Sequence, residues 1–211
     1  MQSPSLFDAA TERTLKRPDL PVIGEQKDIR YYGTRCKSVL NDTDVTGMGF
    51  WSINPYVGCA FGCAYCYARY AHRYVIERSV TAHPEQRMLR EAFESLPPWL
   101  AFERQIFVKE NAAEVLRRTL RYGSDKHLNL LRGEGIGIGT ATDPYQPAED
   151  TERLMPAILE ALIETPPRAF VLQTRGPGVL RDAHLLRELA GRTTVRVSFS
   201  LTTNREDVRR L

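Results

Sequence analysis

The stretch NPYVGCAFGCAYCYARY, Asn54 to Tyr70, decides how this chain is interpreted. It holds Cys59, Cys63 and Cys66, three of the four cysteines in the chain, at the spacing C-x3-C-x2-C. In a chain of 211 residues, thiols this close together are more typical of a metal site than of a disulfide framework. Two questions follow: which metal needs three thiolates in one loop, and why no fourth cysteine stands beside them.

The composition is that of an ordinary globular chain. Hydrophobic residues make up 42% and charged residues 26%, and the formal net charge is +3. This small charge neither supports nor excludes a nucleic-acid partner. The first residues lack the apolar core of a secretory signal peptide, and no later segment is apolar over a membrane-spanning length. We therefore expect a cytoplasmic protein with no membrane partner.

From residue 50 onward, short apolar strands alternate with amphipathic helices. Such βα units predict a parallel sheet with right-handed crossovers. A complete eight-unit barrel typically needs about 250 residues, so we expect residues 50–211 to form an α/β domain with about five βα units, an open or partial barrel. Residues 1–49, which are polar and punctuated by prolines and glycines, are expected to be an irregular N-terminal extension. The predicted strands are 49–57, 104–110, 135–143, 169–174 and 194–203.

Four residues carry specific expectations about the helices between these strands. Asn111 is expected to cap the helix that follows the second strand. Pro156 either kinks the next helix or stands in its first turn. Leu180 is expected to face the sheet from the helix after the fourth strand. Asn204 begins a further helix that the chain does not finish, which predicts a C-terminally truncated domain.

Polar residues follow each predicted strand, and in parallel α/β folds the chemistry lies at the carboxyl ends of the strands. The cysteines follow the first strand, and hydroxyl residues crowd the fifth. We therefore expect these ends to line one polar cavity. The other residues expected there are Lys109, Glu110, Asn111, Thr140, Thr142, Asp143, Tyr145, Gln146, Gln173, Thr174, Arg175, Ser198, Ser200, Thr202 and Thr203.

The cysteine spacing favours an iron–sulfur cluster over structural zinc. Zinc sites are usually built from four ligands in two short pairs, and here Cys36 stands alone, 23 residues before Cys59. A polynuclear cluster suits thiolates in a single loop. Three ligands leave one iron open to a cofactor or substrate, which indicates a catalytic site. Gly58 and Gly62 let the backbone wrap closely around such a cluster.

CAFGCAYC, following a first strand in a βα-repeat domain, resembles the radical S-adenosylmethionine superfamily. CKSVLN (Cys36–Asn41), NPYVGC, CYARY and GTATDPYQPAED (Gly139–Asp150) are similar to its branch related to spore photoproduct lyase. The likeness covers nearly all of residues 35–211. It implies a partial (βα)6 barrel, of which this chain lacks the sixth unit.

The resemblance also implies the chemistry. Cys59, Cys63 and Cys66 would hold a [4Fe–4S] cluster whose fourth iron binds the amino and carboxylate groups of S-adenosylmethionine. A one-electron reductant of the flavodoxin or ferredoxin type would supply the electron that splits this cofactor into methionine and a 5′-deoxyadenosyl radical, and the radical would abstract hydrogen from an unknown substrate. Tyr65 matches the aromatic position beside the adenine.

Further cofactor contacts are expected by position. Lys109 and Asn111 stand where many members have a Gly-Gly-Glu run, and they are candidates for the methionyl group. The candidates for the ribose hydroxyls are Gln173, Thr174, Ser198 and Ser200. The TDPYQP segment has two interpretations, a loop facing the substrate or cofactor, or a turn in which Asp143 bonds its own backbone.

Two alternatives to an unassigned radical enzyme remain open. One is repair of DNA photoproducts, which would make nucleic acid the substrate, with arginines such as Arg69 and Arg73 meeting phosphates or simply facing solvent. The lyases use a cysteine downstream of the cluster as hydrogen donor, and no cysteine follows Cys66 in this chain. The other is a non-catalytic iron–sulfur or zinc protein. Cys36 is either a small buried hydrophobe or a hydrogen donor.

Overall fold

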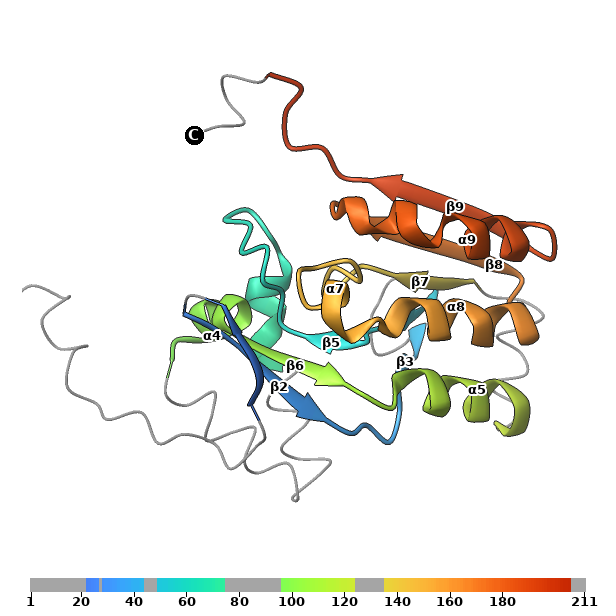
Figure 1. The fold of residues 1–211 in the computed structure, drawn as a ribbon, viewed down its shortest axis with the longest axis horizontal. Coiled ribbons are helices and arrows are strands. Elements are labelled where there is room, and N and C mark those ends of the chain that lie inside the picture. Colours follow the sequence, from blue (N-terminus) through green and yellow to red (C-terminus); the bar gives the residue numbers. More distant parts are fainter. Residues whose placement is uncertain (1–21, 27, 44–48, 75–95, 124–134, 206–211) are drawn as a thin grey trace, which may run out of the picture.

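A computed structural model describes residues 22–26, 28–43, 49–74, 96–123 and 135–205. The protein is a mixed α/β structure in which two sheets are joined by the chain between β4 (Trp51–Ile53) and β5 (Tyr56–Val57) (Figure 1). Within the described ranges, no helix combines the length and the apolar character needed to cross a membrane.

The larger sheet has the order β3-β4-β7-β8-β9. Its strands β4, β7, β8 and β9 are parallel to one another, as predicted, and β3 is antiparallel to β4. The bounds of the strands not yet given are β3 (Leu40–Asn41), β7 (Ile136–Ile138), β8 (Ala169–Thr174) and β9 (Thr194–Phe199).

The smaller sheet corrects the expected strand order. Its order is β1-β2-β6-β5, where β6 (Gln105–Lys109) is parallel to β2 (Ile29–Thr34) and antiparallel to β5. The predicted second strand is therefore not part of the parallel sheet. Helix α4 (Pro98–Arg104) leads into β6 without a loop. The Cys59 N–H donates to the Phe102 carbonyl of α4 and β6 is antiparallel to β5, so β6 starts beside the cysteines and runs away from them.

The N-terminal segment is also more regular than expected. Strands β1 (Val22–Gln26), β2 and β3 all fall within residues 1–49. Tyr31 and Tyr32 of β2 are buried, and β2 lies between β1 and β6. The description of residues 1–49 as irregular is wrong for these three strands, because β-sheet pairing outweighs the local prolines and glycines.

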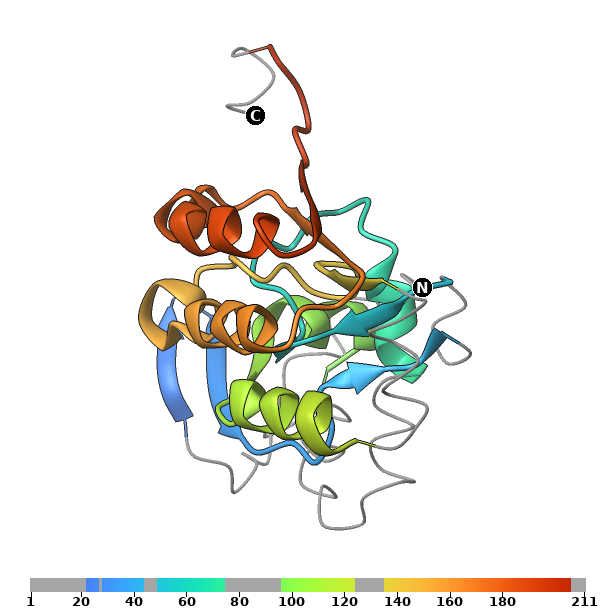
Figure 2. The ribbon, with the colours of Figure 1, turned by 90° about the vertical axis from the view of Figure 1, so that its right-hand side faces the viewer.

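Three helices form one layer against the strands. Figure 2 shows α5 (Ala112–Tyr122), α8 (Leu154–Glu164) and α9 (Ala183–Ala190), in green, orange and red, stacked along one side. Their apolar faces fill the main core together with residues of both sheets. The predicted amphipathic spacing of α5 is confirmed, since Ala112, Val115, Leu116 and Leu120 are all buried.

The ends of these helices differ from expectation in two places. Asn111 occupies the position before α5, but its side chain makes no capping bond and instead pairs with the backbone of Cys36. Leu180 is 75% exposed, because it lies in the 3-10 helix η3 (Pro177–Asp182), whose tighter turn shifts it off the buried face. Pro156 stands in the first turn of α8, which settles the choice between the two alternatives.

Arg153, with φ of 54°, separates α7 (Glu149–Glu152) from α8. After the cysteine loop, the chain is helical at 68–74. Strand β9 ends at Phe199, earlier than predicted, and most of its side chains are exposed. The helix expected from Asn204 is not helical at 204–205, and 206–211 lie outside the described residues.

Candidate functional site

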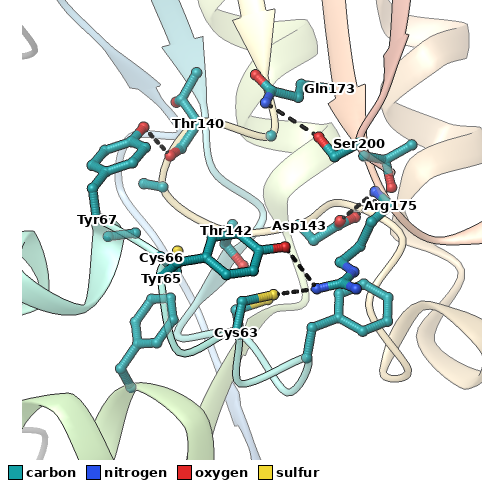
Figure 3. A pocket seen from close by; sticks show the side chains of 17 residues that line it. Cys63, Tyr65, Cys66, Tyr67, Thr140, Thr142, Asp143, Gln173, Arg175 and Ser200 are labelled. Carbon is teal, nitrogen blue, oxygen red and sulfur yellow. Dashed lines mark hydrogen bonds between the residues drawn. The ribbon is translucent and has the colours of Figure 1, made fainter. Parts of the chain in front are cut away.

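A cavity of about 190 Å³ lies where the cysteine loop meets the carboxyl ends of β7 and β8 (Figure 3). It brings together segments that are far apart in the sequence: the loop after β5, the loops after β7 and β8, and the chain just beyond β9. Its lining residues are Cys59, Phe61, Cys63, Tyr65, Cys66, Tyr67, Ala68, Phe102, Gly139, Thr140, Ala141, Thr142, Asp143, Gln173, Thr174, Arg175 and Ser200.

The cysteine loop begins in close contact with α4. The backbone N–H of Cys59 donates to the carbonyl of Phe102 at 2.8 Å. Gly58 has φ of 86°, and a Cβ on it would lie 2.8 Å from the same carbonyl oxygen. Glycine is required at this position because a side chain would meet backbone and would also disfavour the left-handed conformation. The entry to the loop is thus held against the body of the protein.

The loop after β7 holds the cysteine loop from the other side. The hydroxyl of Thr142 donates to the carbonyl of Gly58 at 2.6 Å. Gln146 donates to the Thr142 hydroxyl at 3.0 Å and accepts a bond from the Ala60 N–H at 2.9 Å. Both Thr142 and Gln146 are buried, so these bonds are shielded from water. The TDPYQP segment therefore positions the thiols.

Asp143 fixes the loop after β7 to the end of β8. Its carboxylate accepts bonds from the Tyr145 N–H at 2.9 Å, the Thr174 hydroxyl at 2.6 Å and the Arg175 N–H at 2.8 Å. Burial raises the pKa of Asp143, and these donors act against that rise. The turn interpretation is confirmed, because Asp143 bonds its own backbone as in an Asx turn. Asp143 also lines the cavity, and that the segment faces a substrate or cofactor there stays a prediction.

The cavity wall carries one arginine whose role the sequence did not reveal. Arg175 donates from its guanidinium to the sulfur of Cys63 and to the Tyr65 hydroxyl, and its charge lies 5.5 Å from the centre of the Phe61 ring (Figure 3). The available signal was its place directly after β8. Its partners lie more than a hundred positions away in the sequence, so the pairing was not predictable.

The structure brings some of the predicted site residues together. Tyr65, Gln173, Thr174 and Ser200 all line the cavity with the three cysteines. Gln173 and Ser200 are adjacent, with their side-chain N and O atoms 3.5 Å apart. Ser198, although opposite Gln173 in the ladder of β8 and β9, is not among the lining residues.

Lys109 and Asn111 lie away from this cavity. Because β6 runs antiparallel to β5, its carboxyl end points to the edge opposite the cysteines. The Lys109 ammonium donates to the carbonyl of Asn54 at 2.7 Å, and burial lowers the pKa of this lysine. The Asn111 amide is bound to the Cys36 backbone. The arrangement thus separates both residues, and Cys36, from the three clustered thiols.

The chemistry of the thiols can be compared with what a metal group requires. Among the described residues, no three His, Cys, Asp or Glu side chains are arranged to hold a metal ion. The cysteines nevertheless share one cavity, and thiolates bound to different irons of a cluster need not converge on one point. Burial raises the pKa of Cys59 to about 12, so its thiolate needs a positive partner such as iron.

A second observation concerns the polar wall. The hydroxyl oxygen of Thr140 is buried and has no hydrogen-bond partner among the described residues. Because buried polar atoms are normally paired, this atom fits a ligand with a polar group in the cavity. The donor set and the cavity wall therefore fit a thiolate-bound iron group with an organic cofactor beside it.

Fold and site together define a mixed α/β protein with a thiol-lined cavity at the ends of parallel strands. No protein-family model and no solved structure matches the chain. Uncharacterized proteins of Mycobacterium tuberculosis and Mycobacterium bovis are 33% identical to it over 184 residues, which is 86% of this chain and 46% of each relative. An uncharacterized protein of Methanocaldococcus jannaschii is 24% identical over 156 residues, 74% of this chain and 46% of its own length. The chain spans about half the length of the curated relatives it matches.

Proposed function

We propose that the chain belongs to a radical S-adenosylmethionine enzyme of the branch related to spore photoproduct lyase. The observation that carries the proposal is the convergence of Cys59, Cys63 and Cys66 with Tyr65 around one cavity. On this proposal the parallel strands β4, β7, β8 and β9 are part of a partial (βα)6 barrel, with β6 departing from the parallel order.

On this proposal, different residues of the cavity would bind different parts of the cluster and its cofactor. The three cysteines would hold a [4Fe–4S] cluster, which when bound supplies the single electron that cleaves S-adenosylmethionine. Tyr65 would lie beside the adenine. The positive charge on the cavity wall comes from Arg175 rather than from Lys109, and it suits the methionyl carboxylate.

The sugar of the cofactor would meet a polar wall. Gln173 lines the cavity from β8, and Ser200 lines it from the chain after β9. The amide of Gln173 and the hydroxyl of Ser200 are both suited to hydrogen bonds with ribose hydroxyls. Thr174 is buried and already committed to Asp143, so its part is to hold the loop. The apolar rings of Phe61 and Phe102 line the same cavity, and they would limit the access of water to the bound cofactor.

Anaerobic reconstitution with iron and sulfide tests the proposal. We expect a brown protein with about four irons per chain that forms 5′-deoxyadenosine from S-adenosylmethionine when reduced. Cys63→Ala should abolish the colour. Cys36→Ala is the matched control and should retain it, because Cys36 lies apart from the other thiols. A colourless protein that binds one zinc, or bleaching by Cys36→Ala alone, would refute the assignment.

One observation favours a nucleic-acid substrate as the second candidate, that is, a photoproduct-lyase type of repair. Tyr67, Tyr70 and Tyr74 follow the last cysteine at helical spacing and are 59%, 80% and 66% exposed. Exposed aromatic rings beside a site can stack on unpaired bases. Binding of an ultraviolet-damaged oligonucleotide, with affinity that falls as salt rises, would support this candidate, and absence of binding at low salt would remove it.

A further inference from the structure

Two of the three thiols, Cys59 and Cys63, have different electrostatic surroundings. The sulfur of Cys59 is approached by the backbone N–H groups of Phe61 and Asp143, which are neutral dipoles. The sulfur of Cys63 accepts a bond from the guanidinium of Arg175, which carries a full positive charge. The charge of the Cys63 thiolate is therefore balanced more directly by the protein than that of Cys59.

The guanidinium is held in place from several directions. One of its terminal nitrogens, Nη1, reaches both Cys63 and the Tyr65 hydroxyl, the latter at 3.4 Å. The other, Nη2, donates to the Thr202 hydroxyl at 3.1 Å, and the hydroxyls of Tyr65 and Thr202 are themselves 3.2 Å apart. The charge also lies 5.5 Å from the centre of the Phe61 ring.

The backbone of Arg175 is equally constrained. Its N–H donates to Asp143 at 2.8 Å, and the preceding Thr174 donates to the same carboxylate. The side chain therefore leaves β8 from a fixed point and ends in a fork held by two hydroxyls. Held in this way, the guanidinium of Arg175 keeps its positive charge beside the sulfur of Cys63.

We propose that Arg175 tunes the redox behaviour of the iron group bound through Cys63, making it easier to reduce. This inference rests on the proposed function. Hydrogen bonds to cluster sulfurs and nearby charge set the reduction potential of iron–sulfur groups. Uptake of one electron, from a carrier protein or from dithionite, adds one negative charge near Arg175. No bond forms or breaks at the arginine, which keeps its protons and donates a stronger hydrogen bond.

The test is a redox titration of reconstituted protein, without S-adenosylmethionine so that the result reports on the sulfur alone. Arg175→Gln should lower the midpoint potential by about 59 mV or more, which corresponds to at least a tenfold change in the one-electron equilibrium constant. Arg175→Lys keeps the charge without the planar fork and should fall between the wild type and Arg175→Gln. Arg187→Gln removes an exposed positive charge on α9 and should leave the potential unchanged.

Tyr65→Phe provides a second variant with the charge intact. It removes one of the hydroxyls that hold the fork and should lower the potential by less than Arg175→Gln does. Equal potentials in the wild type and Arg175→Gln overturn the inference. So does loss of the cluster from both Arg175→Gln and Arg175→Lys, because Arg175 would then be needed for assembly. A wild type that binds no iron refutes the proposed function itself.

Discussion

His72 makes the stability of this fold depend on pH in a predictable direction. Its imidazole is 2% exposed and lies edge-on against the ring of Phe102, with the ring centres 5.3 Å apart. Phe102 also accepts the hydrogen bond that begins the cysteine loop. Burial lowers the pKa of His72 from 6.5 to about 4, because the charged form loses its water.

Proton linkage determines whether the free energy of unfolding rises or falls with pH. Between pH 6.5 and about 4 the unfolded chain binds a proton at His72 that the folded chain does not, so the free energy of unfolding falls as the pH falls. At 1.36 kcal/mol per pH unit, the full span is worth about 3 kcal/mol. The contribution is complete above pH 6.5, and about 2 kcal/mol of it is lost by pH 5.

Urea unfolding at pH 7.5 and pH 5 measures the effect. His72→Phe keeps an aromatic ring against Phe102 and removes the titrating group, so the variant should lose about 2 kcal/mol less than the wild type between the two pH values. His184→Phe is the matched control, since His184 is exposed, and it should keep the wild-type pH dependence. Equal pH losses in the wild type and His72→Phe would refute the reasoning.

Two further changes test the scaffold around the cavity. Gly139→Ala should destabilise the protein by well over the roughly 1–2 kcal/mol of left-handed strain alone, because the new Cβ would lie 1.8 Å from the Gln173 carbonyl oxygen. Gly49→Ala also has a positive φ, but no atom of the described residues lies within 4 Å of its new Cβ, so it should cost only the strain. Thermal unfolding compares the two, and equal losses would contradict the clash. Glu149→Gln should cost about 3 kcal/mol in urea unfolding, because Glu149 is 1% exposed and binds the Tyr56 hydroxyl, two backbone N–H groups and Arg181. A loss below 1 kcal/mol would show that this buried network contributes little.

Much of the parallel sheet was predictable from local pattern. The run AFVLQT forms β8 with the predicted bounds, and the helix after it buries Leu186 and Leu189. The direction of β6 was not predictable in the same way. An apolar, β-branched run fits either a parallel or an antiparallel neighbour, and β6 has one of each, β2 parallel and β5 antiparallel, which only the tertiary pairing decides.

Whether a predicted site residue reaches the cavity depends on whether the direction of its strand was predicted correctly. Gln173 lies in β8 and Ser200 directly follows β9, two strands whose direction the alternating pattern predicted, and both residues reach the cavity. Lys109 and Asn111 were assigned by assuming that β6 ends at the same edge, and the structure places them elsewhere. Asn111 also shows that a residue typical of helix caps takes a distant partner when one is offered, here the Cys36 backbone 75 positions away.

By itself, the sequence determined the spacing of the three thiols and the periodic apolar faces that build the parallel strands and their helices, since both are properties of a few neighbouring residues. The tertiary structure decided which polar groups surround those thiols. Arg175 reaches Cys63 across 112 positions of chain, and Gln146 reaches Ala60 across 86. Such contacts depend on how strands are ordered and directed in space, which is a result of long-range packing that no local pattern encodes.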